Sequence, residues 1–164
     1  MSDSRMLPYA QPVLECEDCD GTTRWLATKP PSFAADIVLE LHGPNGRWTP
    51  AVVIECKLGS FDTHNVLAYA AKARSHRAVF PALRYGVLLA HWPAGITGKL
   101  ARHGESFDFL ATWKAEGPTD AEWDVLLTIL RHELAAAATL RGLAAPGKSE
   151  KLKARWIHRG LMAG

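Results

Sequence analysis

The sequence predicts an α/β domain in which helices flank a central mixed sheet, and three observations support this prediction. Runs rich in branched aliphatic residues at 35–42, 50–58 and 84–91 are typical of buried strands. An alanine-rich stretch between the second and third runs favours a helix. A later stretch, from 119 to about 140, repeats leucine at helical spacing. Strands alternating with helices indicate a sheet that is at least partly parallel.

Three strands are expected before the first helix. The segment 22–28 resembles a strand stopped by two prolines, and 35–42 follows as the second strand. The turn-forming letters GPNGR at 43–47 predict a hairpin to the third strand, 50–58. Residues 1–21 are polar with two prolines, and they predict no element.

The first helix is expected to begin at Asp62 or Thr63, either of which can cap it, and to end near Val79. It lies between two strands as a crossover, so the strands 50–58 and 84–91 are expected to be parallel.

The remaining chain predicts a loop, a strand and a helix. The segment 92–104 has the composition of a loop, and 107–114 resembles a fifth strand. Thr119 and Glu122 form a capping box that opens the second helix.

Size and composition suit a single domain: 164 residues, 48% hydrophobic, with a net charge of only +2. We expect a core at about 22–114, a C-terminal helix at about 119–141 and a basic tail at 147–164. Apolar stretches are too short for a membrane span, and a signal peptide is not expected. Three cysteines cannot all pair, which favours a reduced, cytoplasmic protein.

The charges are unevenly distributed along the chain. Between Asp62 and Glu105 there is no acidic residue, although this window carries six lysines and arginines. Such segregation is what a protein that binds polyanions needs, and it is also compatible with ordinary solvated cations.

The most informative letters are VVIECKLG at 52–59, where a buried strand ends in charged residues. Strand side chains alternate, so Glu55 and Lys57 share one face and Cys56 takes the other. The hairpin can bring Asp36 beside Glu55. Two carboxylates that converge with an ammonium group are costly to hold together unless a divalent cation such as Mg²⁺ joins them. The purely structural alternative is a surface salt bridge between neighbouring strands, with Lys57 in solvent at the strand end.

An aspartate in one strand, a turn and then Glu-x-Lys resembles the PD-(D/E)XK nuclease superfamily. The resemblance implies a restriction-endonuclease-like αβββαβ core and Mg²⁺-dependent hydrolysis of phosphodiester bonds, with Mn²⁺ able to substitute. It implies Asp36 and Glu55 as metal ligands, the backbone carbonyl of Cys56 as a further ligand, and Lys57 as the catalytic lysine. Ala35 stands where the family motif has proline. Many relatives add a glutamate from an N-terminal helix, and only Glu15 or Glu17 is available for that role.

The helix after Lys57 carries polar residues at spacings that place them on one stripe. These residues are Asn65, Tyr69, Lys72 and His76, flanked by Arg74 and Arg77. The stripe is a candidate nucleic-acid contact, and equally a candidate solvent face of a helix that packs on the core.

The sequence therefore predicts a DNA endonuclease that is active in restriction, defence, repair or recombination, with a homodimer as one possible assembly. The alternative is a non-catalytic nucleic-acid-binding or assembly module with the same fold, and RNA in place of DNA stays open. Cys16 and Cys19 have zinc-knuckle spacing but lack a second ligand pair, so unpaired thiols are favoured over zinc.

Overall fold

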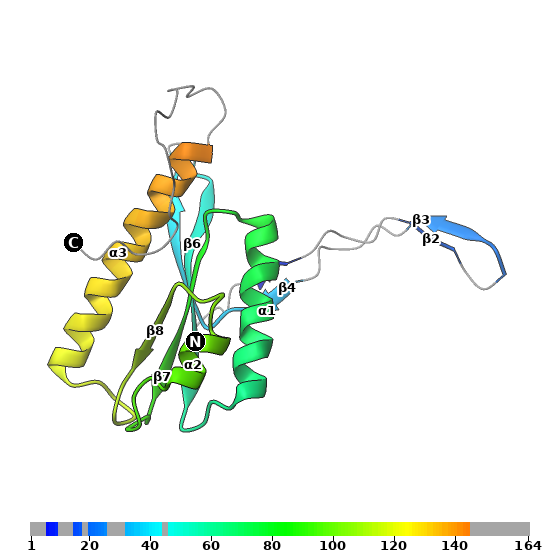
Figure 1. The fold of residues 1–164 in the computed structure, drawn as a ribbon. Helices are drawn as coiled ribbons and strands as arrows, with labels where there is room; N and C mark the ends of the chain where they lie inside the picture. Colours follow the sequence, from blue (N-terminus) through cyan, green and yellow to red (C-terminus); the bar gives the residue numbers. More distant parts are fainter. Residues whose placement is uncertain (1–5, 10–14, 18–19, 26–31, 44–45, 145–164) are drawn as a thin grey trace, which may run out of the picture.

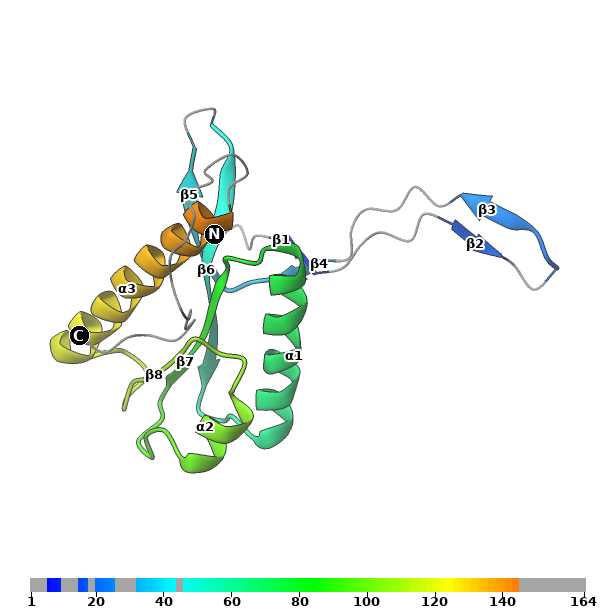
Figure 2. The same cartoon turned by 45° about the horizontal axis from the view of Figure 1, so that its top comes forward.

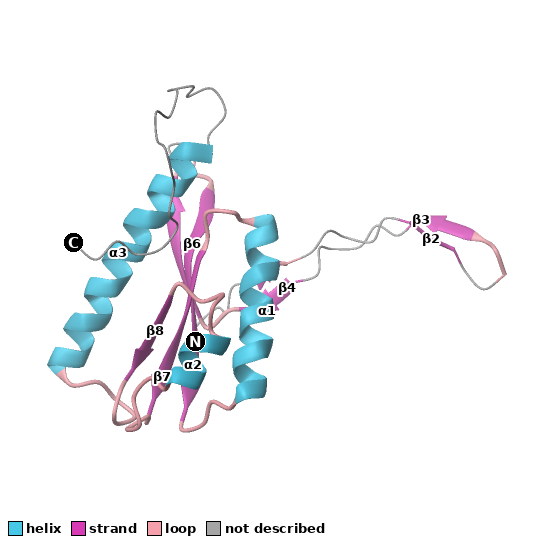
Figure 3. Ribbon diagram, viewed as in Figure 1, coloured by secondary structure: helices cyan, strands magenta, loops and turns pink. Residues whose placement is uncertain are grey.

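A computed structural model describes residues 6–9, 15–17, 20–25, 32–43 and 46–144. A four-stranded sheet lies between two helical layers, with α1 and α2 on one face and α3 on the other (Figure 1). The elements in chain order are β1 (Met6–Pro8), β2 (Glu15–Glu17), β3 (Thr23–Trp25), β4 (Ser32–Ala34), β5 (Ile37–His42), β6 (Trp48–Leu58), α1 (Thr63–Val79), β7 (Arg84–Ala90), α2 (Gly98–His103), β8 (Phe109–Thr112) and α3 (Asp120–Ala144). Figure 3 distinguishes the helices from the strands.

The central sheet is mixed, with strand order β5-β6-β7-β8. The hairpin expected at 43–47 is confirmed: β5 and β6 are antiparallel, with Ile37 opposite Ile54. β6 and β7 are parallel, with Glu55 opposite Val87, as the intervening helix predicted. β7 and β8 are also parallel. The sheet therefore carries the C-terminal ends of β6, β7 and β8 at one edge.

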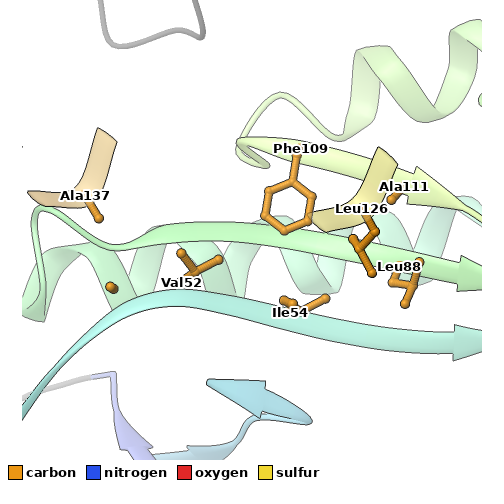
Figure 4. Close-up of a cluster of buried hydrophobic side chains, with 8 residues drawn as sticks. Val52, Ile54, Leu88, Phe109, Ala111, Leu126 and Ala137 are labelled. Atoms are coloured by element: carbon orange, nitrogen blue, oxygen red, sulfur yellow. The ribbon is translucent and has the colours of Figure 1, made fainter. Parts of the chain in front are cut away.

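The face of the sheet under α3 holds a cluster of buried apolar side chains (Figure 4). Its members are Ala51, Val52, Ile54, Leu88, Phe109, Ala111, Leu126 and Ala137. The Phe109 ring lies so close to Gly86 that a Cβ there would stand 2.3 Å from it. Glycine is thus required by packing, and the central strand β7 can only accommodate the ring because residue 86 has no side chain.

The opposite face of the sheet is covered by α1, which begins and ends as expected. The Asp62 carboxylate accepts a hydrogen bond from Asn65 N at 2.8 Å and so caps the helix. Val66, Ala70 and Ala73 are buried against the sheet. Small residues at these positions let the helix approach closely, which places its polar stripe within reach of β6.

The helix α3 also begins at its expected signal. The Thr119 hydroxyl accepts from Glu122 N at 3.3 Å, and the Glu122 carboxylate accepts from Thr119 N at 2.8 Å. The predicted capping box is confirmed, and α3 continues to Ala144. The expected basic tail at 147–164 lies outside the described residues.

One segment that we expected to be a loop, 92–104, contains a short helix instead. The Thr97 hydroxyl accepts from Leu100 N and caps α2, and Leu100 is buried against α1 and the sheet. One buried leucine is too weak a periodic signal to recognise in a sequence, because a six-residue helix has little more than one turn.

The described part of the first expected strand, 22–25, does not join the central sheet. It includes β3, which pairs with β2, while β1 pairs with β4. In Figures 1 and 2 the β2–β3 pair lies apart from the sheet and helices. Before β5 the described residues form strands only, so the initial helix that the resemblance implied is not among them. Within the described chain, each helix is too short or too polar to cross a membrane.

Candidate active site

The Asp36 carboxylate lies beside the C-terminal half of β6, at the end of the β5–β6 pair that is opposite the hairpin turn. It directly precedes β5, whose first residue, Ile37, pairs with Ile54, the neighbour of Glu55 on β6. Its Oδ2 accepts a hydrogen bond from Cys56 N at 2.8 Å. The side chain is exposed, so one backbone bond fixes a carboxylate that solvent and ligands can still reach.

Glu55 is buried, with only 3% of its surface exposed, and two donors reach the same oxygen of its side chain. Lys72 Nζ and the Tyr85 hydroxyl both donate to Oε1 at 2.8 Å. A buried carboxylate without such partners would be strongly unfavourable. The helix α1 and the strand β7 therefore hold Glu55 in place together.

Lys57 lies on the same face as Glu55, as the alternation predicted, and its Nζ is 5.1 Å from the centre of the Tyr69 ring. A hydrogen bond with the Tyr69 side chain raises the pKa of Lys57, and the charges of Asp36 and Glu55 act in the same direction against the effect of burial. Lys57 is therefore positively charged at neutral pH. Lys72 Nζ lies 5.0 Å from the same ring, so Tyr69 contacts both ammonium groups.

Cys56 points to the other face, where it packs against the cluster under α3. Burial first, and then the charges of Asp36 and Glu55, raise the pKa of its thiol to about 11. A thiol of this kind is neutral and a poor nucleophile. The N–H and C=O groups of a strand residue point the same way, so the Cys56 carbonyl faces the edge where Asp36 lies.

His76 is completely buried beneath the site, between Phe33 and Tyr85. Its Nδ1 lies 3.1 Å from the Pro8 carbonyl, which can only accept, so the proton is on Nδ1 and Nε2 carries the lone pair. Among the described residues Nε2 has no hydrogen-bond partner. Burial is the main cause that lowers the pKa of His76.

The expected polar stripe of α1 thus faces the sheet over most of its length. Tyr69, Lys72 and His76 all contact the cluster around Glu55. Asn65 lies at the start of the helix, where its backbone N–H bonds the capping Asp62.

The two arginines of α1 face different surroundings. Arg74 donates to the Ser106 hydroxyl at 2.9 Å. Arg77 pairs with Asp108, which also binds Arg84, and Arg84 in turn pairs with the buried Glu133 of α3. This ion-pair network joins both helices to the sheet, so Arg77 has a packing role in the structure.

The candidate residues near the N-terminus are not part of this cluster. Glu15, Cys16 and Glu17 lie on β2, whose partner is β3 and not the central sheet (Figure 2). Cys19 lies outside the described residues. Among the residues that the structure describes, no three His, Cys, Asp or Glu side chains form a metal-binding group.

The sequence did not show that Tyr85 and Lys72 would be the partners of Glu55. Tyr85 is the one aromatic residue of a largely aliphatic strand, and its polar tip is the signal that could have marked it. Lys72 was a candidate either for a nucleic-acid contact or for the solvent face of the helix, and in the structure it binds Glu55. Neither contact follows from spacing, because each joins two separate elements.

Hard oxygen donors suit the cation that the resemblance implies. Asp36 is accessible, and it bonds Cys56 just beyond the last β5–β6 pair. Glu55, the residue before Cys56 on β6, contributes the second carboxylate. Asp36 bonds the backbone of Cys56, and Glu55 and Lys57 are the neighbours of Cys56 on β6, so the charged groups belong to one strand end. Mg²⁺ commonly takes one or two protein carboxylates and completes its shell with waters and substrate oxygens. The residues present therefore fit such an ion.

Comparisons of the chain with protein-family models, curated proteins and solved structures found no match. The structure shows an α/β fold with a four-stranded mixed sheet, on which Lys72 pairs with Glu55 and Asp36 bonds the backbone of Cys56.

Proposed function

We propose that this protein is a Mg²⁺-dependent endonuclease of the PD-(D/E)XK type, with a restriction-endonuclease-like core, that hydrolyses phosphodiester bonds of DNA. The observation that supports the proposal is that Asp36, just before β5, bonds the backbone of β6 at Cys56, between Glu55 and Lys57. The order of β5, β6, α1 and β7 agrees with the last four elements of the αβββαβ core that the resemblance implies.

Asp36, Glu55 and the Cys56 carbonyl would hold the ion. When bound, Mg²⁺ would polarise the scissile phosphate and activate water for hydrolysis. The charged Lys57 would orient the attacking water and offset the negative charge that develops on the phosphate. The exposed position of Asp36 lets a phosphodiester approach, while the buried Glu55 is fixed in advance by Lys72 and Tyr85. Fixed groups of this kind reduce the reorganisation needed during reaction.

The test is cleavage of supercoiled plasmid DNA with and without Mg²⁺ by the wild type, Asp36→Ala and Lys57→Ala. Losing a group that contributes several kcal/mol to the transition state lowers the rate by about a thousandfold. We therefore expect cleavage only with Mg²⁺ and only by the wild type at a readily measured rate. Equal cleavage by all three proteins would reject the site. A structured RNA in a parallel reaction decides between the two nucleic acids.

One observation favours a second candidate, a non-catalytic nucleic-acid-binding or assembly module. Glu55 already has a cationic partner in Lys72, so the fold is satisfied without a metal ion. This alternative predicts salt-sensitive DNA binding without metal-dependent cutting. Calorimetric titration with Mn²⁺ separates the candidates. A nuclease should bind Mn²⁺ and lose this binding in Asp36→Ala, whereas a non-catalytic module should show no Mn²⁺ binding that depends on Asp36.

A homodimer remains part of the proposal, since one site cuts one strand at a time. Light scattering with and without duplex DNA measures the state of assembly.

A further inference from the structure

The site balances its own charge before any ion binds. Asp36 and Glu55 contribute two carboxylates, and Lys57 and Lys72 contribute two ammonium groups. Lys72 and Glu55 form a direct ion pair at 2.8 Å, and the Glu55 carboxylate is almost completely buried. A divalent cation that arrived alone would have to compete with Lys72 for Glu55. It would also leave two uncompensated positive charges in a partly buried place.

We propose that Lys72 is a displaceable counter-ion of Glu55, so that a divalent cation and a nucleic-acid phosphate bind this site together. The proposal rests on the proposed function, and it concerns the order in which the ligands bind. The phosphate supplies the negative charge that the cation otherwise lacks. Lys72, once released from Glu55, is a second ammonium group for that phosphate.

The surroundings of Lys72 favour such a displacement. Its Nζ lies 4.9 Å from the centre of the Phe33 ring and 5.0 Å from that of Tyr69. Aromatic faces stabilise an ammonium group whether or not it is also paired with a carboxylate. About a fifth of the side chain is exposed, and the lysine stem is flexible. Lys72 can therefore leave Glu55 without being stranded in an apolar environment.

Tyr85 does not share this behaviour, although it donates to the same oxygen. Its hydroxyl is neutral and its side chain is fully buried, so it stays with Glu55 while the ammonium group is exchanged for an ion. The two donors thus differ in role: Tyr85 positions the carboxylate, and Lys72 holds its charge until a cation takes over.

The test is calorimetric titration with Mn²⁺ for wild type, Asp36→Ala, Lys72→Met, Lys72→Arg and Arg74→Met. Arg74 is the matched control, because it lies on the same helix and bonds Ser106 instead of Glu55. Each protein is titrated alone and then with a short DNA duplex. These runs are done at low temperature, with gels to verify uncut DNA, and the Mn²⁺ bound by DNA alone is subtracted. Thermal melts confirm that each variant is folded.

We expect Lys72→Met to bind Mn²⁺ about tenfold more tightly than the wild type in the absence of DNA, because one nearby charge is worth at least that factor in affinity. In the titrations without DNA, Lys72→Arg and Arg74→Met should bind Mn²⁺ within about twofold of the wild type. DNA should tighten Mn²⁺ binding by about tenfold in the wild type and by much less in Lys72→Met.

Two further outcomes would overturn the idea in different ways. If Asp36→Ala abolishes Mn²⁺ binding but Lys72→Met binds no more tightly than the wild type, the metal site stands and the counter-ion role is rejected. If no protein binds Mn²⁺ with or without DNA, the proposed function and this inference are both rejected.

Discussion

Replacing Tyr85 by phenylalanine tests how strongly the sheet fixes Glu55. The substitution removes a single oxygen from a fully buried ring and leaves its packing nearly unchanged. What is lost is the 2.8 Å hydrogen bond to Glu55 Oε1. Burial raises the pKa of Tyr85 far above its usual range, so the hydroxyl remains a donor at every pH that the protein tolerates.

The magnitude follows from the kind of bond. A hydrogen bond to a charged group contributes about 1.5–3 kcal/mol, and Lys72 still compensates the Glu55 carboxylate. We therefore expect Tyr85→Phe to lower the free energy of unfolding by about 2 kcal/mol. With a urea m-value of about 2 kcal/mol/M, the unfolding midpoint falls by about 1 M while the slope stays constant.

The assay is urea unfolding followed by circular dichroism, combined with a double-mutant cycle. Tyr85→Phe is measured in the wild type and in Glu55→Gln, and the difference between its two effects isolates the pair. We expect a coupling of about 1–2 kcal/mol. Tyr69→Phe is the control, because its hydroxyl meets Lys57 at a half-buried position.

Plasmid cleavage by Tyr85→Phe should fall by about 10- to 100-fold, the usual effect of losing a partner that orients a metal ligand. The reasoning is refuted if Tyr85→Phe unfolds within about 0.5 kcal/mol of the wild type, or if it loses as much stability in the Glu55→Gln background.

Two other predictions concern stability. The pKa of His76 is lowered by burial, so its unfolded form gains a proton at a higher pH than its folded form. The contribution of His76 to the free energy of unfolding is fully present above about pH 6.5 and falls as the pH drops below it, by up to about 2 kcal/mol at pH 5. Urea unfolding at pH 7 and pH 5 measures this difference. The variant His76→Gln should lose most of the pH dependence. Gly86→Ala should destabilise by about 1–3 kcal/mol because its Cβ would meet the Phe109 ring at 2.3 Å, whereas Gly142→Ala meets no atom within 4 Å and should be neutral or stabilising. Equal melting temperatures for the two alanine variants would contradict the packing argument.

Local sequence patterns were sufficient for the main elements and for one half of the site. The letters GPNGR fixed the β5–β6 hairpin, and the alternation along β6 placed Glu55 and Lys57 on one face. Asp62 and the Thr119–Glu122 box marked the starts of both long helices. These features depend on neighbours within a few residues. The alternation of side chains along a strand and their repeat of about four residues along a helix can be read directly from the sequence.

Other features depended on contacts between distant segments. The pattern did not reveal α2, because its anchor is the single buried Leu100. Arg74 and Arg77 looked equivalent to Lys72 on the helix, yet they meet Ser106 and Asp108, which lie just before β8. The N-terminal strands pair with one another, and their letters carry no sign of which partner they choose.

The sequence by itself determined which strands pair around the hairpin and which way the carboxylates and Lys57 point, because these properties follow from short-range periodicity and turn chemistry. Only the tertiary structure decided that Lys72 and Tyr85 share one oxygen of Glu55, 17 and 30 residues away. That choice depends on how α1 and β7 pack on β6. Packing is set by the fit of many side chains at once, and no local pattern encodes it.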